Sequence, residues 1–143
     1  MSAARARATA VALCLALSLG LGACGQDQGE SDAVRAAARS YFAALGSGNG
    51  AQACRMLTDE VRKQFVAGVA AITSASTCEQ ALQTLLKGSS GHLVRRVARA
   101  ARIGAAKVDG DTATVKLSSN AQEVDVRMRK QNGAWRVDQP PST

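Results

Sequence analysis

Four cysteines are the residues of this chain whose chemistry depends most on their surroundings. Cys14 lies inside an apolar N-terminal segment, Cys24 ends that segment, and Cys54 and Cys78 lie in the body of the chain. A cysteine thiol can be modified, can pair in a disulfide or can bind a metal, and its compartment decides which of these persists. The residues around each cysteine therefore indicate its chemistry.

The segment before Cys24 has the charge order and the length of a secretion signal. Arg5 and Arg7 are its only charges, and residues 8–26 carry none. Its most apolar part, AVALCLALSLGLG, has the length of a signal peptide and is short for a stable membrane span. An ordinary secreted protein and an uncleaved signal anchor are the alternatives that these features leave open.

The end of this segment, Leu-Gly-Ala-Cys at residues 21–24, resembles the lipobox of bacterial lipoproteins. Gly22 stands where alanine or serine is more usual. The earlier cysteine, Cys14, follows a leucine, which is too large for the residue that precedes the cleavage site of a lipoprotein signal. The resemblance implies that residues 1–23 are removed and that Cys24 carries a diacylglyceryl group. Two acyl chains hold a protein firmly on a membrane, so we expect a lipid-anchored protein on the extracytoplasmic face of the cell membrane.

The remaining chain is long enough for one domain of ordinary size. The whole sequence has a formal net charge of +7, and two of its basic residues lie in the signal, so the mature chain is only modestly basic. Low aromatic content disfavours nucleic acid as a partner. We expect the lipidated cysteine and a short polar tether at 24–31, a single domain at 32–139 and a tail at 140–143.

Cys54 and Cys78 are the two cysteines left in this domain. An exported protein folds where disulfides form, and with Cys24 acylated only one pairing within the chain remains. Closing a loop of about 25 residues stabilises a protein by roughly 3.5 kcal/mol. Two cysteines and the single His92 lack the spacing of zinc ligands, so we predict a disulfide, no metal site and no cofactor.

The periodicity of the sequence changes once along the domain. Apolar residues recur at helical spacing from Ser31, a potential N-cap, to Gly46, a stop signal. Further helices are predicted at 50–57, 59–66, 78–88 and 93–102. After residue 101 the period becomes 2, and strands are predicted at 101–108, 112–118, 123–130 and 134–138, separated in part by Asp-Gly and Asn-Gly turns. Each strand has one apolar face, which predicts an α+β fold with N-terminal helices packed on an antiparallel meander.

Three stretches in this order, SYFAALGSGN, VDGDTATV and NGAWRVD, resemble the nuclear-transport-factor-2-like superfamily of the cystatin-like α+β kind. More narrowly, the chain resembles the small lipoproteins of that superfamily in high-GC bacteria that carry a cysteine pair on helices. The resemblance covers residues 31–138 and implies a long helix held in a strongly curved sheet, forming a cone with an apolar pocket. The expected pocket residues are Tyr41, Phe42, Val115, Val126, Met128 and Trp135.

The resemblance also raises an enzymatic alternative. Ketosteroid isomerases of the superfamily use a tyrosine of the first helix as an oxyanion donor, and Tyr41 stands at the matching position. That chemistry also needs an aspartate base and a second donor. Asp59 and Glu60 fall at the exposed start of a predicted helix, and His92 lies in a predicted loop without a visible partner. We therefore predict no catalytic residue and interpret Tyr41 as a core residue whose hydroxyl bonds the backbone.

The stretch LVRRVARAAR is the one basic concentration in the sequence. Contact with anionic lipid is one interpretation, and a solvated face in an arginine-rich protein is the other, which the composition favours. The arginines concerned are Arg95, Arg96, Arg99 and Arg102.

Together these features predict a non-catalytic lipoprotein that binds a small apolar ligand or an envelope partner protein. A small enzyme of isomerase or dehydratase type and a structural accessory module of an envelope complex are the alternatives. A filled interior favours the accessory module, whereas a cavity of a few hundred cubic ångströms favours a ligand or a substrate.

Overall fold

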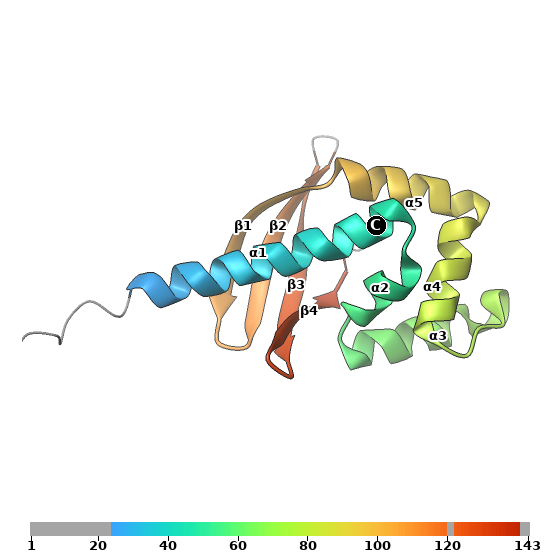
Figure 1. The fold of residues 1–143 in the computed structure, drawn as a ribbon, viewed down its shortest axis with the longest axis horizontal. Coiled ribbons are helices and arrows are strands. Elements are labelled where there is room, and N and C mark those ends of the chain that lie inside the picture. The colour runs from blue at the N-terminus through green and yellow to red at the C-terminus, as the bar shows by residue number, and fades with distance from the viewer. Residues whose placement is uncertain (1–23, 120–121, 141–143) are drawn as a thin grey trace, which may run out of the picture.

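A computed structural model describes residues 24–119 and 122–140 of the chain. Within them five helices precede four strands, as predicted, and the fold is α+β (Figure 1). The helices are α1 (Cys24–Ser47), α2 (Gly50–Arg55), α3 (Asp59–Thr73), α4 (Cys78–Lys87) and α5 (Ser89–Ala100). The strands are β1 (Arg102–Asp109), β2 (Thr112–Ser119), β3 (Gln122–Gln131) and β4 (Ala134–Gln139). The predicted signal peptide and most of the predicted tail lie outside the described residues.

The four strands form one open antiparallel sheet in the order β1-β2-β3-β4. The predicted meander is therefore confirmed. The turns between β1 and β2 and between β3 and β4 use residues that tolerate a left-handed backbone, with φ of 57° at Gly110, 53° at Asn132 and 77° at Gly133. Such turns match the twist of the strands that they join, so neighbouring strands pair directly.

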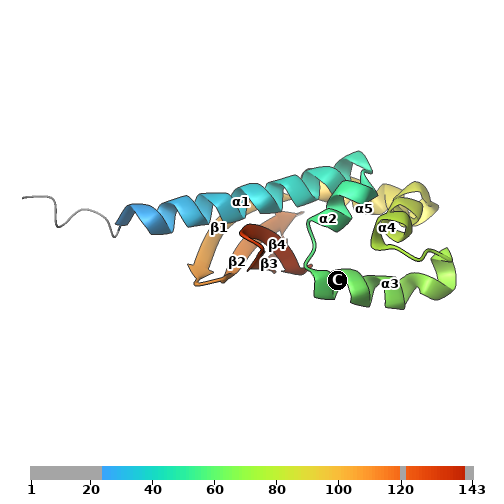
Figure 2. The same ribbon diagram turned by 60° about the horizontal axis from the view of Figure 1, so that its bottom comes forward.

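Helix α1 lies along one face of the sheet (Figure 2). The predicted apolar face of α1 is buried there, from Val34 to Leu45. The alternating residues of β2, β3 and β4 supply the opposite wall of the core: Ala113, Val115, Leu117, Val126, Met128, Trp135 and Val137. Burial of a valine, leucine or methionine side chain contributes about 1.5–3 kcal/mol, so this interface contributes strongly to stability.

The structure differs from the sequence-based expectation at residues 24–31, which form the start of α1 rather than an extended tether. Glu30 accepts hydrogen bonds from Lys130 Nζ at 2.8 Å and from Trp135 Nε1 at 2.9 Å. Ser31 Oγ donates to the carbonyl oxygen of Ala106 at 2.9 Å. These polar contacts hold the start of α1 against the sheet, although the segment has no apolar periodicity.

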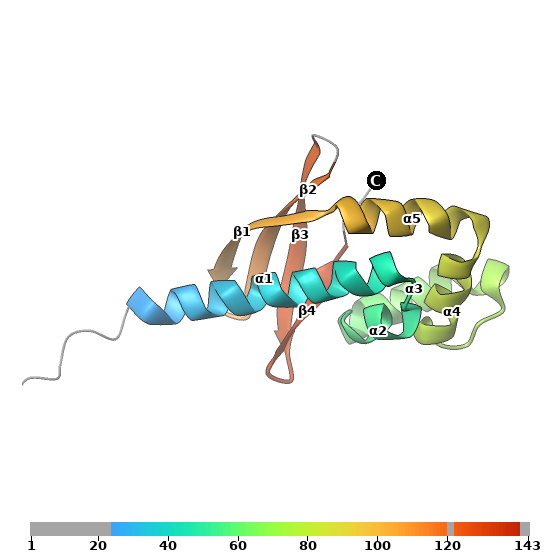
Figure 3. The ribbon, with the colours of Figure 1, turned by 45° about the horizontal axis from the view of Figure 1, so that its top comes forward.

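Helices α2 to α5 form a second group beyond one end of the sheet (Figure 3). The predicted disulfide is present: Cys54 of α2 is bonded to Cys78 of α4, with their Cα atoms 6.0 Å apart. Thr58 caps α3, and its backbone N–H donates to the carbonyl oxygen of Val137 at 2.9 Å. This group is therefore joined to β4 through the backbone as well as through packing.

Candidate functional site

The six residues of the predicted pocket do come together, from α1, β2, β3 and β4, but they do so inside the hydrophobic core. None is more than 8% exposed, and Val115 and Val126 are fully buried. Only Phe42 also borders the surface cavity described below. The six residues therefore act chiefly as the packed interface between α1 and the sheet.

Tyr41 lies within this core with 6% of its surface exposed. Its ring meets that of Phe42 edge to face, with 5.2 Å between the centroids. Burial raises the pKa of the Tyr41 phenol to about 12, because the low-dielectric surroundings disfavour the charged form. Among the described residues the hydroxyl has no hydrogen-bond partner, so the predicted bond to the backbone is not found in this part of the chain.

The other residues considered for chemistry lie apart from Tyr41 on the surface. Asp59 and Glu60 are exposed at the start of α3, as predicted. His92 lies in the first turn of α5 rather than in a loop, and its Nδ1 is 2.9 Å from Arg95 Nη2. Within residues 24–119 and 122–140, no group of three or more His, Cys, Asp or Glu side chains is arranged to hold a metal ion.

A surface cavity of about 450 Å³ lies where α5 and the start of β1 meet the C-terminal half of α1. We call it the α1–α5 groove. It is lined by Arg39, Phe42, Ala43, Gly46, Ser47, Ala98, Arg99, Ala101 and Ile103. Helices α1 and α5 run side by side here (Figure 3). No local pattern in the sequence indicates this groove, because its walls come from segments about 50 residues apart.

Small residues let α1 and α5 approach each other and leave the space open. A Cβ atom built at Gly46 would lie 2.9 Å from the Cγ atom of Arg99, closer than such atoms pack. Arg99 Nε donates to the carbonyl oxygen of Gly46 at 2.7 Å. A cation at the C-terminal end of a helix is favoured by the helix dipole. Arg99 therefore both closes the end of α1 and places positive charge at the groove.

A second cavity, of about 580 Å³, lies between α3 and α4. Three of its four charged residues already pair with one another, because Arg62 lies 2.6 Å from Glu79 and 3.7 Å from Asp59. Both cavities have apolar residues beside basic ones, but the α1–α5 groove has no carboxylate among its lining residues to pair with Arg39 and Arg99. It is the cavity better suited to an apolar molecule with a negative group.

Two further observations bear on the predicted location and family. Among the described residues, no helix combines the length and the apolar character that crossing a membrane requires. Comparison of the chain with models of protein families, with curated proteins and with solved structures gave no match. The proposed resemblance therefore stays a prediction, and the geometry carries the functional conclusion.

Proposed function

We propose that this chain is a lipid-anchored, extracytoplasmic and non-catalytic protein that binds a small apolar ligand in the α1–α5 groove. The observation that carries the proposal is the groove itself. Its volume of about 450 Å³ falls in the range of small-molecule sites, and five of its nine lining residues are apolar. Arg39 and Arg99 favour a ligand with one negative group.

The proposal of a non-catalytic role is supported by the chemistry of the lining residues. Proton transfer needs a base within hydrogen-bond reach of the substrate. The groove is lined by two arginines, a serine and otherwise apolar residues or glycine, without histidine or carboxylate. Arginine keeps its proton at all accessible pH values, so these groups bind and orient rather than exchange protons.

The proposal of a lipid anchor is supported by the lipobox resemblance and by the position of α1. The helix begins at Cys24, and Glu30 forms hydrogen bonds with residues of β3 and β4. Six residues of helix span about 9 Å. An acyl anchor on Cys24 would thus hold the domain directly against the bilayer.

The anchor is tested by the mass of the protein extracted from membranes. Cys24→Ser should block lipid attachment and removal of residues 1–23, whereas Cys14→Ser, the matched control, should leave both unchanged. A mature mass without acyl groups would rule out the anchor.

The groove is tested with two related dyes, anionic anilinonaphthalene sulfonate and neutral phenylnaphthylamine. Ala43→Phe places a ring in the groove at an exposed helical position, so both dyes should lose fluorescence enhancement. Ala33→Phe is the control, because Ala33 is an exposed residue of α1 outside the groove lining. Arg39→Gln should weaken binding of the anionic dye more than binding of the neutral dye.

The dye experiment also separates the alternatives. Unchanged binding in Ala43→Phe would show that the dyes bind elsewhere and would contradict the proposed site. No binding of either dye to the parent chain would favour the accessory-module alternative, which the filled space between α1 and the sheet also fits.

A further inference from the structure

Helix α5 leaves its most apolar face uncovered. The sequence pattern groups Leu93, Val94 and Val97 on one side of this helix, and the structure turns that side outward. Their side chains are 56%, 42% and 40% exposed, respectively. The side of α5 that faces the protein carries Gly91 and Ala98 instead. A cluster of exposed branched side chains is a feature that calls for a partner.

Close packing explains why the small residues of α5 face inward. A Cβ atom at Gly91 would lie 2.2 Å from the carbonyl oxygen of Leu86, so no larger residue fits there. Beside it, Arg95 donates to the same carbonyl group at the end of α4. The large apolar residues are thereby left on the outside.

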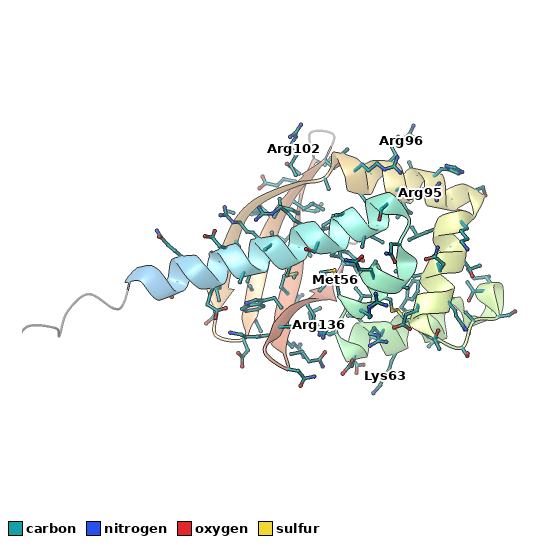
Figure 4. All side chains as sticks on the ribbon, in the orientation of Figure 1. Met56, Lys63, Arg95, Arg96, Arg102 and Arg136 are labelled. Atoms are coloured by element: carbon teal, nitrogen blue, oxygen red, sulfur yellow. A yellow bond between two sulfur atoms is a disulfide. The ribbon has the colours of Figure 1, made fainter. Side chains whose placement is uncertain are left out.

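The same packing divides the four arginines that sequence analysis considered for lipid contact. Arg95 and Arg99 donate to the last carbonyl groups of α4 and α1 and serve as caps. Arg96 and Arg102 are exposed and form no ion pair with any residue in the described part of the chain. Figure 4 shows both of them at the outer edge formed by α5 and the start of β1.

The surroundings of α5 carry one sign of charge. Residues 80–108 contain six lysine and arginine residues and no aspartate or glutamate. Helix α5 lies within this segment, between α4 and β1. The positive charge of its outer edge is therefore not neutralised by neighbours in sequence.

We infer that the outer face of α5 docks on an anionic lipid bilayer. Leu93, Val94 and Val97 would enter the boundary between headgroups and acyl chains, as amphipathic interfacial helices do. Arg96 and Arg102 would meet the lipid phosphates, and each arginine near such a surface contributes about 1 kcal/mol. A bilayer is the occupant that matches an apolar face and a basic edge on a domain tethered beside it. The tether itself rests on the proposed anchor at Cys24.

Docking of α5 determines the orientation of the anchored protein relative to the membrane. Arg99 contacts Gly46, which is 22 residues along α1 from Cys24, or about 33 Å of helix. If α1 stood upright, α5 would lie several Debye lengths of about 8 Å from the membrane. Docking therefore requires α1 to lie along the membrane, attached at both ends.

Vesicle sedimentation of residues 25–143 tests the inference without the lipid anchor. All the described helices and strands, apart from the first residue of α1, lie within this fragment. The fragment should bind vesicles of equal parts phosphatidylglycerol and phosphatidylcholine, should bind phosphatidylcholine alone much more weakly, and should be released by salt. Arg96→Gln should lower the affinity about fivefold. Leu93→Ser and Val97→Ser should each lower it by a similar factor.

Matched controls lie on α3. Lys63→Gln removes an exposed positive charge on the opposite side of the molecule (Figure 4), and Ile72→Ser removes an apolar side chain that is 75% exposed. Both should bind vesicles like the parent fragment. Failure of the parent to bind anionic vesicles, or equal losses in the α3 controls, would overturn the inference. Because the fragment lacks Cys24, its result is independent of lipidation and of dye binding in the groove.

Discussion

Alkaline titration of Tyr41 tests the packed interface between α1 and the sheet. Tyr41 is the only tyrosine in the chain, so its ionisation can be followed without interference. Burial raises its pKa from 10.0 to about 12. A catalytic oxyanion donor would need a partner or a reacting oxygen at its hydroxyl, whereas a core tyrosine only needs to stay neutral.

The raised pKa has a definite effect on stability. Below pH 10 the phenol is neutral in the folded and the unfolded chain, and the stability linked to it is fully present. Between pH 10 and pH 12 only the unfolded chain loses the proton, so unfolding becomes easier as pH rises. A difference of two pKa units corresponds to about 3 kcal/mol lost from the free energy of unfolding.

The assay is the near-ultraviolet absorbance of tyrosinate in the native protein and in denaturant. The absorbance transition of the native protein should occur at a pH well above that of the denatured protein, or it should coincide with alkaline unfolding. Tyr41→Phe should remove the part of the stability loss at alkaline pH that comes from this phenol. It should change the free energy of unfolding at pH 7 by less than about 1 kcal/mol, because the hydroxyl has no partner in the described structure.

Two results would refute this reasoning. Titration of the native protein near pH 10 would show that Tyr41 is solvated. If Tyr41→Phe lost as much stability at alkaline pH as the parent, the loss would have to come from other groups. Turnover of a ketosteroid that fell about a hundredfold or more in Tyr41→Phe would instead restore the isomerase alternative.

Three further predictions concern stability. Cys54→Ser and Cys78→Ser should each lower the free energy of unfolding by about 3.5 kcal/mol, and the double variant by little more, measured with denaturant; clearly additive losses would contradict a shared crosslink. The pKa of Glu30 is lowered chiefly by the hydrogen bond from a lysine of β3. The stability from this contact is present above pH 4.5 and lost as pH falls through the folded pKa, so acid should destabilise the parent more than Glu30→Gln in thermal melts. A Cβ atom at Gly50 would lie 2.5 Å from the backbone of α4, so Gly50→Ala should lower the free energy of unfolding by about 1–3 kcal/mol. Gly68 has open space around it, so Gly68→Ala should raise the free energy of unfolding by about 0.5–1 kcal/mol.

Much of the fold could be predicted because local patterns carry it. The change of period after residue 101 separates helices from strands, and Asn132 with Gly133 requires a tight turn whatever lies around it. The alternation of β2 and β3 places Val115 and Val126 in the core because successive strand residues face opposite sides of a sheet. With Cys24 assigned to lipid, only one disulfide was left to form. The turns and the alternation need only neighbours in sequence, and the disulfide needed only the count of the cysteines that remained.

The start of α1, the α1–α5 groove and the outer face of α5 could not be predicted, because they depend on contacts between distant segments. Glu30 is held against the sheet by partners 100 and 105 residues along the chain. The pattern of α5 shows an apolar side and a basic side, and ordinarily the apolar side would face the protein. Its orientation was decided by Gly91 and Gly46, where backbones or arginine stems approach too closely for a larger side chain. Periodicity tells which residues share a face of a helix, but only close packing against other helices decides which face is buried.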